Sequence, residues 1–166
     1  MKILVAVDER ACGEALADFI GSHVWPVGAD FKVFHVIKQL GTDDFRRFLR
    51  LPLVEDIADE LRSSGEHLVR RVAIALRDAL HTSHVEEQVV EGDPRTNIVG
   101  VAKEWGADLI VVGSHAPQSA GGLPGTVSMA VVSGAPCSVL VLRSAPTPKE
   151  TDVMTDIDRK PASRTE

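Results

Sequence analysis

The segment from Gly113 to Thr126 is the part of this 166-residue chain whose residue types and spacing best suit ligand chemistry. It follows an apolar run, contains Gly121, Gly122 and Gly125, and leads into a helical pattern. The backbone N–H groups of such a loop, together with the N-terminus of the next helix, can bind an anion such as a phosphate. Composition leaves open the alternative of a surface loop in which Thr126 only caps its own helix.

Asp8 is the second residue with a chemical interpretation. It ends the first apolar run, and its carboxylate could contact a ribose or a cation, or it could cap the first helix. In open α/β sheets, ligands bind beyond the carboxyl ends of the strands. This rule directs attention to Asp8, Val36 and Gly113.

Several other chemistries lack their motifs. The chain has no G-x-x-x-x-G-K-[ST], G-x-G-x-x-G or G-x-S-x-G sequence, which argues against a P-loop, an ordinary dinucleotide site and an α/β-hydrolase nucleophile. His81 and His84 have no third metal ligand nearby in sequence, and Cys12 and Cys137 form no metal-binding motif. We therefore predict neither a metal site nor a catalytic residue, and we interpret His35 as a core residue.

Strands and helices alternate along the chain. Apolar runs predict strands at residues 2–7, 31–37, 84–90, 108–113 and 138–142. Three-and-four spacing predicts helices at residues 12–20, 54–80, 94–105 and 126–133, the last closed by Gly134. Asp93 and Pro94 suit an N-cap and a first helical residue, and Gly106 suits a left-handed C-cap. The sequence therefore predicts an α/β fold of the flavodoxin-like or Rossmann-like kind, with a mainly parallel sheet.

Composition and charge narrow the environment and the partners. The chain is 44% hydrophobic with a formal net charge of −6, which gives little support to nucleic acid or membrane binding. It has no apolar run of the roughly 18 residues that span a bilayer and no secretory pattern at its start, so we expect a cytoplasmic protein. We predict one domain over residues 1–144 and a flexible polar tail over residues 145–166.

Several sequence blocks resemble the universal stress protein family, in the same order. The blocks are Ile-Leu-Val-Ala-Val-Asp8, Val90-Glu-Gly-Asp-Pro94, Gly106-Ala-Asp-Leu-Ile-Val-Val-Gly-Ser-His115, Gly125-Thr-Val-Ser128 and Ala135-Pro-Cys-Ser-Val-Leu-Val-Leu-Arg143. The resemblance implies an open five-stranded parallel sheet of order 3-2-1-4-5 with helices on both faces, similar to the adenine nucleotide alpha hydrolase-like fold. In one branch of the family it also implies ATP, with Mg²⁺ as a possible companion, between strands one and four.

The same resemblance implies a set of ligand-binding residues. It assigns Val36 to the adenine and Gly113, Gly125 and Thr126 to the ribose and phosphates. The complete expected set is Ala6, Val7, Asp8, Val36, Gly113, Ser114, His115, Ala116, Gly125, Thr126 and Val127.

The phosphate loop departs from the family pattern. Ala116 stands where the family has its second glycine, and eight residues rather than nine separate it from Gly125. The Cβ of alanine restricts positive φ, at a cost of roughly 1 kcal/mol or more if the loop needs that conformation. A protein-interaction module without nucleotide is therefore the alternative to a nucleotide-binding protein.

The last predicted strand indicates self-association. An apolar strand at a sheet edge favours pairing with another copy, which a two-fold axis would bury. The predicted homodimer pairs through Ser138, Val139, Leu140, Val141 and Leu142. We expect a homodimeric regulator in stress response that binds an adenine nucleotide without obligatory turnover.

Overall fold

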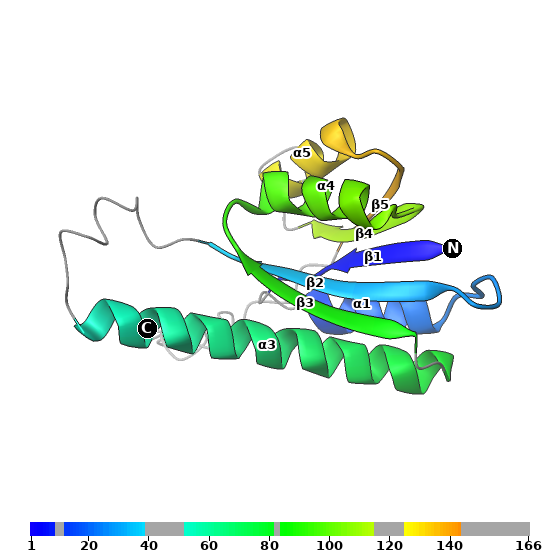
Figure 1. Ribbon diagram of the computed structural model, residues 1–166. Coiled ribbons are helices and arrows are strands. Elements are labelled where there is room, and N and C mark those ends of the chain that lie inside the picture. Colours follow the sequence, from blue (N-terminus) through cyan, green and yellow to red (C-terminus); the bar gives the residue numbers. More distant parts are fainter. Residues whose placement is uncertain (9–11, 39–51, 82–83, 115–124, 144–166) are drawn as a thin grey trace, which may run out of the picture.

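One parallel sheet organises the structure, a computed structural model that describes residues 1–8, 12–38, 52–81, 84–114 and 125–143. The strands are β1 (Lys2–Ala6), β2 (Asp30–Ile37), β3 (Val85–Glu91), β4 (Leu109–Ser114) and β5 (Ser138–Arg143). The helices are α1 (Cys12–Gly21), α3 (Pro52–Leu80), α4 (Pro94–Trp105) and α5 (Thr126–Gly134). The predicted α/β architecture is confirmed (Figure 1).

The strand order is β3-β2-β1-β4-β5, and every pairing is parallel, as predicted. The central strand β1 pairs with β2 on one side and β4 on the other, so that Val5 lies opposite both Val33 and Val111. Because all five strands run in one direction, their carboxyl ends share one edge of the sheet. That edge carries the candidate site.

Helices cover both faces of the sheet (Figure 1). Alternate residues of β1 face opposite ways: Ile3 and Val5 pack in one apolar cluster with α1 and α3, and Leu4 and Ala6 in the other with α4 and α5. Burial on both faces explains why β1 and β4 are nearly continuous apolar runs rather than alternating ones.

The predicted signals at the ends of α4 are confirmed. Asp93 is the N-cap and accepts a hydrogen bond from the Arg95 backbone N–H, and Pro94 is the first helical residue. Gly106 caps the C-terminus with φ 69°, in the left-handed region that glycine favours.

Helix α5 begins at Thr126, as predicted, and its N-cap is Gly125, with no side-chain capping bond. The alternative in which Thr126 caps the helix is therefore wrong, and so is the predicted end at Gly134. The helix also includes Gly134, and Ala135 ends it in an extended conformation (φ −64°, ψ 141°). Pro136 explains this end, because a residue before proline is driven out of the helical region.

Helix α3 is longer than the sheet requires. Its 29 residues span about 43 Å, whereas a seven- or eight-residue strand spans about 25 Å. Figure 1 shows its N-terminal turns continuing past the carboxyl edge of the sheet. Ile57, expected on the apolar face, is consequently 38% exposed.

Some sequence predictions fall outside the described residues. They are the site residues His115 and Ala116, the tail over residues 145–166, and the capping of α1 by Asp8, since residues 9–11 are also outside. Within the described part, no helix combines the length and apolarity needed to cross a membrane.

Candidate functional site

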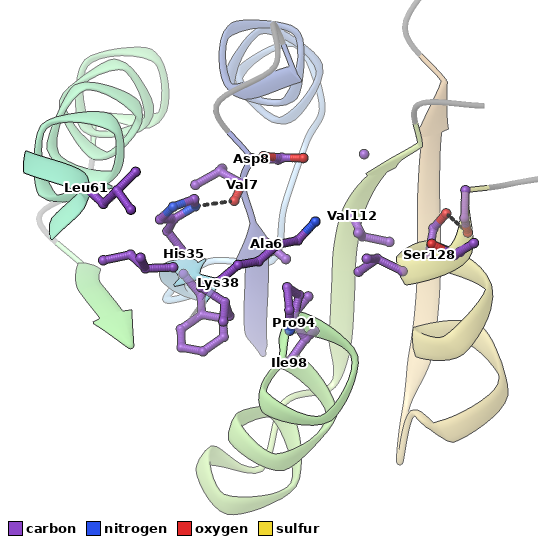
Figure 2. Close-up of a pocket in the computed structure, with 17 residues that line it drawn as sticks. Ala6, Val7, Asp8, His35, Lys38, Leu61, Pro94, Ile98, Val112 and Ser128 are labelled. Carbon is purple, nitrogen blue, oxygen red and sulfur yellow. Dashed lines mark hydrogen bonds between the residues drawn. The ribbon is translucent and has the colours of Figure 1, made fainter. Parts of the chain in front are cut away.

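A pocket of about 440 Å³ opens at the carboxyl edge of the sheet (Figure 2). The ends of β1, β2 and β4, the first turns of α4 and α5, and one residue of α3 surround it. Its lining consists of Ala6, Val7, Asp8, Phe34, His35, Val36, Ile37, Lys38, Leu61, Pro94, Ile98, Val112, Gly113, Gly125, Thr126, Val127 and Ser128. The volume lies in the range of about 300–1,000 Å³ that small-molecule sites occupy.

Val7, the residue after β1, forms two hydrogen bonds with residues of β2. The Val7 N–H donates to the Phe34 carbonyl at 2.9 Å, and the Val7 carbonyl lies 2.9 Å from Nδ1 of His35. Because a carbonyl oxygen can only accept, Nδ1 of His35 carries the proton (Figure 2). These bonds fix the backbone immediately before Asp8, so the position of that carboxylate depends on β2.

The junction of β4 and α5 forms the opposite wall. The Gly125 N–H donates to Oγ of the buried Ser114 at 2.9 Å, which brings the start of α5 to the end of β4. The Gly125 carbonyl in turn accepts from Ser128 Oγ at 3.0 Å. The first N–H groups of a helix have no partner within it, so the start of α5 presents donors to the pocket.

The start of α4 supplies Pro94 and Ile98 to the pocket floor. The pKa of Asp93, the N-cap, is lowered first by hydrogen bonds from the Arg95 backbone and side chain, and to a smaller extent by the charge of Lys38. The partial positive charge of this helix terminus is therefore already matched by a carboxylate.

Helix α3 closes the remaining side through three neighbouring residues. Leu61 lines the pocket, and Arg62 forms an ion pair with Glu91 at the end of β3. The hydrogen bond and the charge of Glu91 raise the pKa of Arg62. Gly65 packs against His35, and a Cβ at this glycine would stand only 2.9 Å from Cδ2 of the imidazole.

Two charged side chains of opposite sign line the pocket among the described residues, Asp8 and Lys38. Figure 2 shows Lys38 extending from the end of β2 across the strand ends, toward the space between Asp8 and Val112. The walls below are apolar and include Ala6 and Val36. Such a pocket can hold a flat apolar ring against the strand ends and an anionic group at the start of α5.

The structure brings together most of the predicted site residues. Those that line the pocket are Ala6, Val7, Asp8, Val36, Gly113, Gly125, Thr126 and Val127. Ser114 lies behind the wall, where it holds Gly125 in place. Sequence analysis missed the contributions of His35, Lys38 and Leu61 to the pocket. Their positions just inside or after an apolar run were the available signal for the first two.

No group of three or more His, Cys, Asp or Glu side chains suited to a metal ion occurs in the described part of the chain. His84, one member of the histidine pair noted in the sequence, instead lies 3.1 Å from Asp30 at the opposite edge of the sheet.

Comparison with known proteins identifies relatives of the whole domain. The sequence profile of the Universal stress protein family matches residues 1–143. Universal stress protein A homolog 2 of Coxiella burnetii is 35% identical over 88 residues, which cover 53% of this chain and 58% of that protein. The match thus spans little more than half of the length of this relative.

Solved structures share the fold. The structure of the protein MJ0577 superposes with a TM-score of 0.70 at 21% identity, covering 88% of this chain and 97% of the other. A family member from Arabidopsis thaliana with AMP bound gives 0.60 at 19% identity, with coverages of 90% and 97%.

Two further structures contain a nucleotide. A universal stress protein in complex with cAMP gives a TM-score of 0.61 at 18% identity, covering 87% of this chain and 98% of the other. One from Archaeoglobus fulgidus in complex with dAMP gives 0.54 at 21% identity, covering 85% and 96%. A family match over nearly all of the described chain, together with the same sheet and helix arrangement, leads to one conclusion. The chain belongs to the universal stress protein family.

Proposed function

We propose that this protein is a regulator in stress response that binds an adenine nucleotide, without obligatory turnover, in the pocket at the carboxyl ends of β1, β2 and β4. The observation that carries the proposal is the convergence of the strand ends and the start of α5 on one pocket of about 440 Å³. The nucleotides AMP, cAMP and dAMP bound to structures of the same fold support the choice of ligand class.

The pocket chemistry suits the two ends of a nucleotide. Apolar groups of Ala6, Val36 and Ile98 can pack against the base. The N–H groups at the start of α5 and the hydroxyl of Thr126 can bind a phosphate. The carboxylate of Asp8, which lines the pocket, can accept hydrogen bonds from ribose hydroxyls. ATP is the proposed ligand within this class, and its phosphates would bring Mg²⁺.

We also propose that the protein is a homodimer that pairs through β5. This strand lies at the sheet edge, and its central residues Val139, Leu140, Val141 and Leu142 remain only half-buried. The neighbouring helix α5 exposes two apolar side chains, Met129 and Val132. Pairing across a two-fold axis would bury this continuous surface.

The first experiment identifies the ligand directly. Protein purified without added nucleotide is denatured, and the released small molecules are identified by mass spectrometry. Calorimetric titration then compares AMP, ATP and ATP with Mg²⁺. Released adenine nucleotide, or binding in the micromolar range, supports the proposal. Empty protein that binds none of the three contradicts it and favours the alternative, an interaction module without nucleotide.

Gly125→Val tests the location of the site. The backbone of Gly125 (φ −62°, ψ 163°) is open to any residue, so the helix that it caps should persist. The added isopropyl group would occupy the pocket at the start of α5. We expect nucleotide binding in calorimetry to be lost while sedimentation velocity reports an unchanged dimer. An unchanged affinity would place the ligand elsewhere.

A further inference from the structure

Lys38 occupies a position in the pocket that suits recognition of the ligand. It follows directly after β2, and its side chain continues the alternation of Phe34 and Val36, which pack toward α4 and α5. Figure 2 shows its ammonium group aimed into the space between Asp8 and Val112, above the apolar floor. The lysine thus points into the same side of the pocket as the start of α5.

Lys38 contributes a positive charge to the pocket. Asp8 lines the pocket, in a chain with a formal net charge of −6. An anionic ligand must therefore enter beside a carboxylate. Among the described residues that line the pocket, Lys38 is the one cationic side chain. Its charge favours an anionic group that enters the pocket.

Lys38 differs from Lys32 in its contacts with the described residues. No hydrogen bond or ion pair joins Lys38 to another of the described residues. The charge of Lys38 does reach Asp93, the N-cap of α4. The pKa of Asp93 is lowered mainly by the hydrogen bonds from Arg95 and to a smaller extent by Lys38. By contrast, Lys32 on the same strand is engaged at the other end of the sheet, where it pairs with Glu86 at 3.1 Å and lies over the ring of Trp105.

We infer that Lys38 determines ligand class in this pocket by binding the anionic group of the nucleotide, so that the site selects nucleotides over nucleosides. The inference rests on the proposed function and adds a residue outside the glycine-containing loop. A flexible lysine stem allows the ammonium group to follow a phosphate as a point charge.

The experiment compares AMP with adenosine, which differ by the phosphate alone. Both are titrated by calorimetry into the wild type, Lys38→Met and Lys38→Arg. Lys103→Met is the matched control, because Lys103 lies exposed in the last turn of α4, away from the pocket. AMP titrations are repeated at low and high salt.

We expect Lys38→Met to weaken AMP binding about tenfold, as for loss of a charge-assisted hydrogen bond, and to leave adenosine binding unchanged. Lys38→Arg should retain most of the AMP affinity, and Lys103→Met all of it. Salt should weaken AMP binding to the wild type more than to Lys38→Met, since a screened charge pair has been removed. The salt dependence of AMP binding tests the phosphate contact even if adenosine binds too weakly to titrate.

Three results would overturn the inference. Unchanged AMP affinity and salt dependence in Lys38→Met would exclude a phosphate contact. Equal losses for AMP and adenosine would mean that Lys38 acts on the base, the ribose or the fold. A wild type that binds AMP no more tightly than adenosine would also overturn the inference. If that wild type in addition binds neither ATP nor ATP with Mg²⁺, the proposed function fails as well, which distinguishes that failure from the first two.

Discussion

Gly65 lies opposite a buried imidazole, and this contact explains a glycine in the middle of a long helix. The missing side chain lets α3 approach the ring of His35, whose Nδ1 holds the carbonyl of Val7. In an isolated helix, a glycine would only reduce the stability at a modest cost. Its role depends on contact with β2, which helical periodicity cannot report.

Gly65→Ala is therefore expected to destabilise the protein, although alanine is the better helix former. The new Cβ would meet Cδ2 of His35 at 2.9 Å, and relieving this overlap should cost about 1–3 kcal/mol. Gly100→Ala in α4 is the control, because nothing lies within 4 Å of its Cβ position. There the gain in helix propensity should stabilise the fold by up to about 1 kcal/mol. Urea unfolding measures both, and stabilisation by both substitutions would contradict the packing argument.

The sequence indicated pocket positions where they follow from local signals. Gly113 and Gly125 line the pocket, and glycines at the end of a strand and the start of a helix can be recognised locally. Lys38 and Leu61 were missed because their place in the pocket depends on where α3 and the sheet edge meet. Thr126 was interpreted as a possible cap, one residue too late, since adjacent Gly125 takes that position.

At the scale of elements, local signals predicted helix ends well and tertiary contacts poorly. The Asp93 and Pro94 pair and Gly106 act through their own backbone, so the sequence located both ends of α4. Helix α3 keeps its apolar spacing beyond the sheet, where Ile57 is 38% exposed. Periodicity therefore predicted that the helix exists without revealing how much of it packs.

The cap of α4 makes stability depend on pH in a defined direction. The pKa of Asp93 is lowered in the folded protein by the hydrogen bonds from Arg95. The stability that the ionised carboxylate of Asp93 contributes is therefore fully present above the ordinary pKa of 3.8. It is lost as the pH falls through the lowered pKa of the folded protein. Asp93→Asn keeps a capping oxygen and removes the charge.

The expected result is a free energy of unfolding that is lower for Asp93→Asn than for the wild type at pH 7. This difference should close as the pH is lowered below 3.8, because the wild-type carboxyl then becomes neutral as well. Denaturant titrations at a series of pH values measure it. A difference that stays constant with pH would show that the charge contributes nothing to the cap.

At the scale of the whole molecule, the proposed dimer requires that the surface formed by α5 and β5 is the interface. Val132 on α5 is 47% exposed, and Ile74 on α3 is 49% exposed on the other side of the sheet. Val132→Glu should weaken the dimer at least about tenfold, because a carboxylate would be buried in the apolar contact. Ile74→Glu should leave the dimer intact.

Sedimentation velocity over a range of protein concentrations measures this difference. The two substitutions introduce the same charge at apolar sites of nearly equal exposure, so a general effect on solubility would appear in both. Equal dissociation, or none in either variant, would argue against an interface formed by α5 and β5.

The central place of β1 in the sheet has a consequence for how the chain is made. β1 leaves the ribosome before the other four strands, yet its neighbour β4 follows only after α1, β2, α3, β3 and α4. Until then, the side of β1 that will pair with β4 is an open apolar edge on the nascent polypeptide, where association with other chains competes with folding. The pocket, which includes both Asp8 and Gly125, is completed only after α5 has been made, so no ligand bound there can assist the earlier stages.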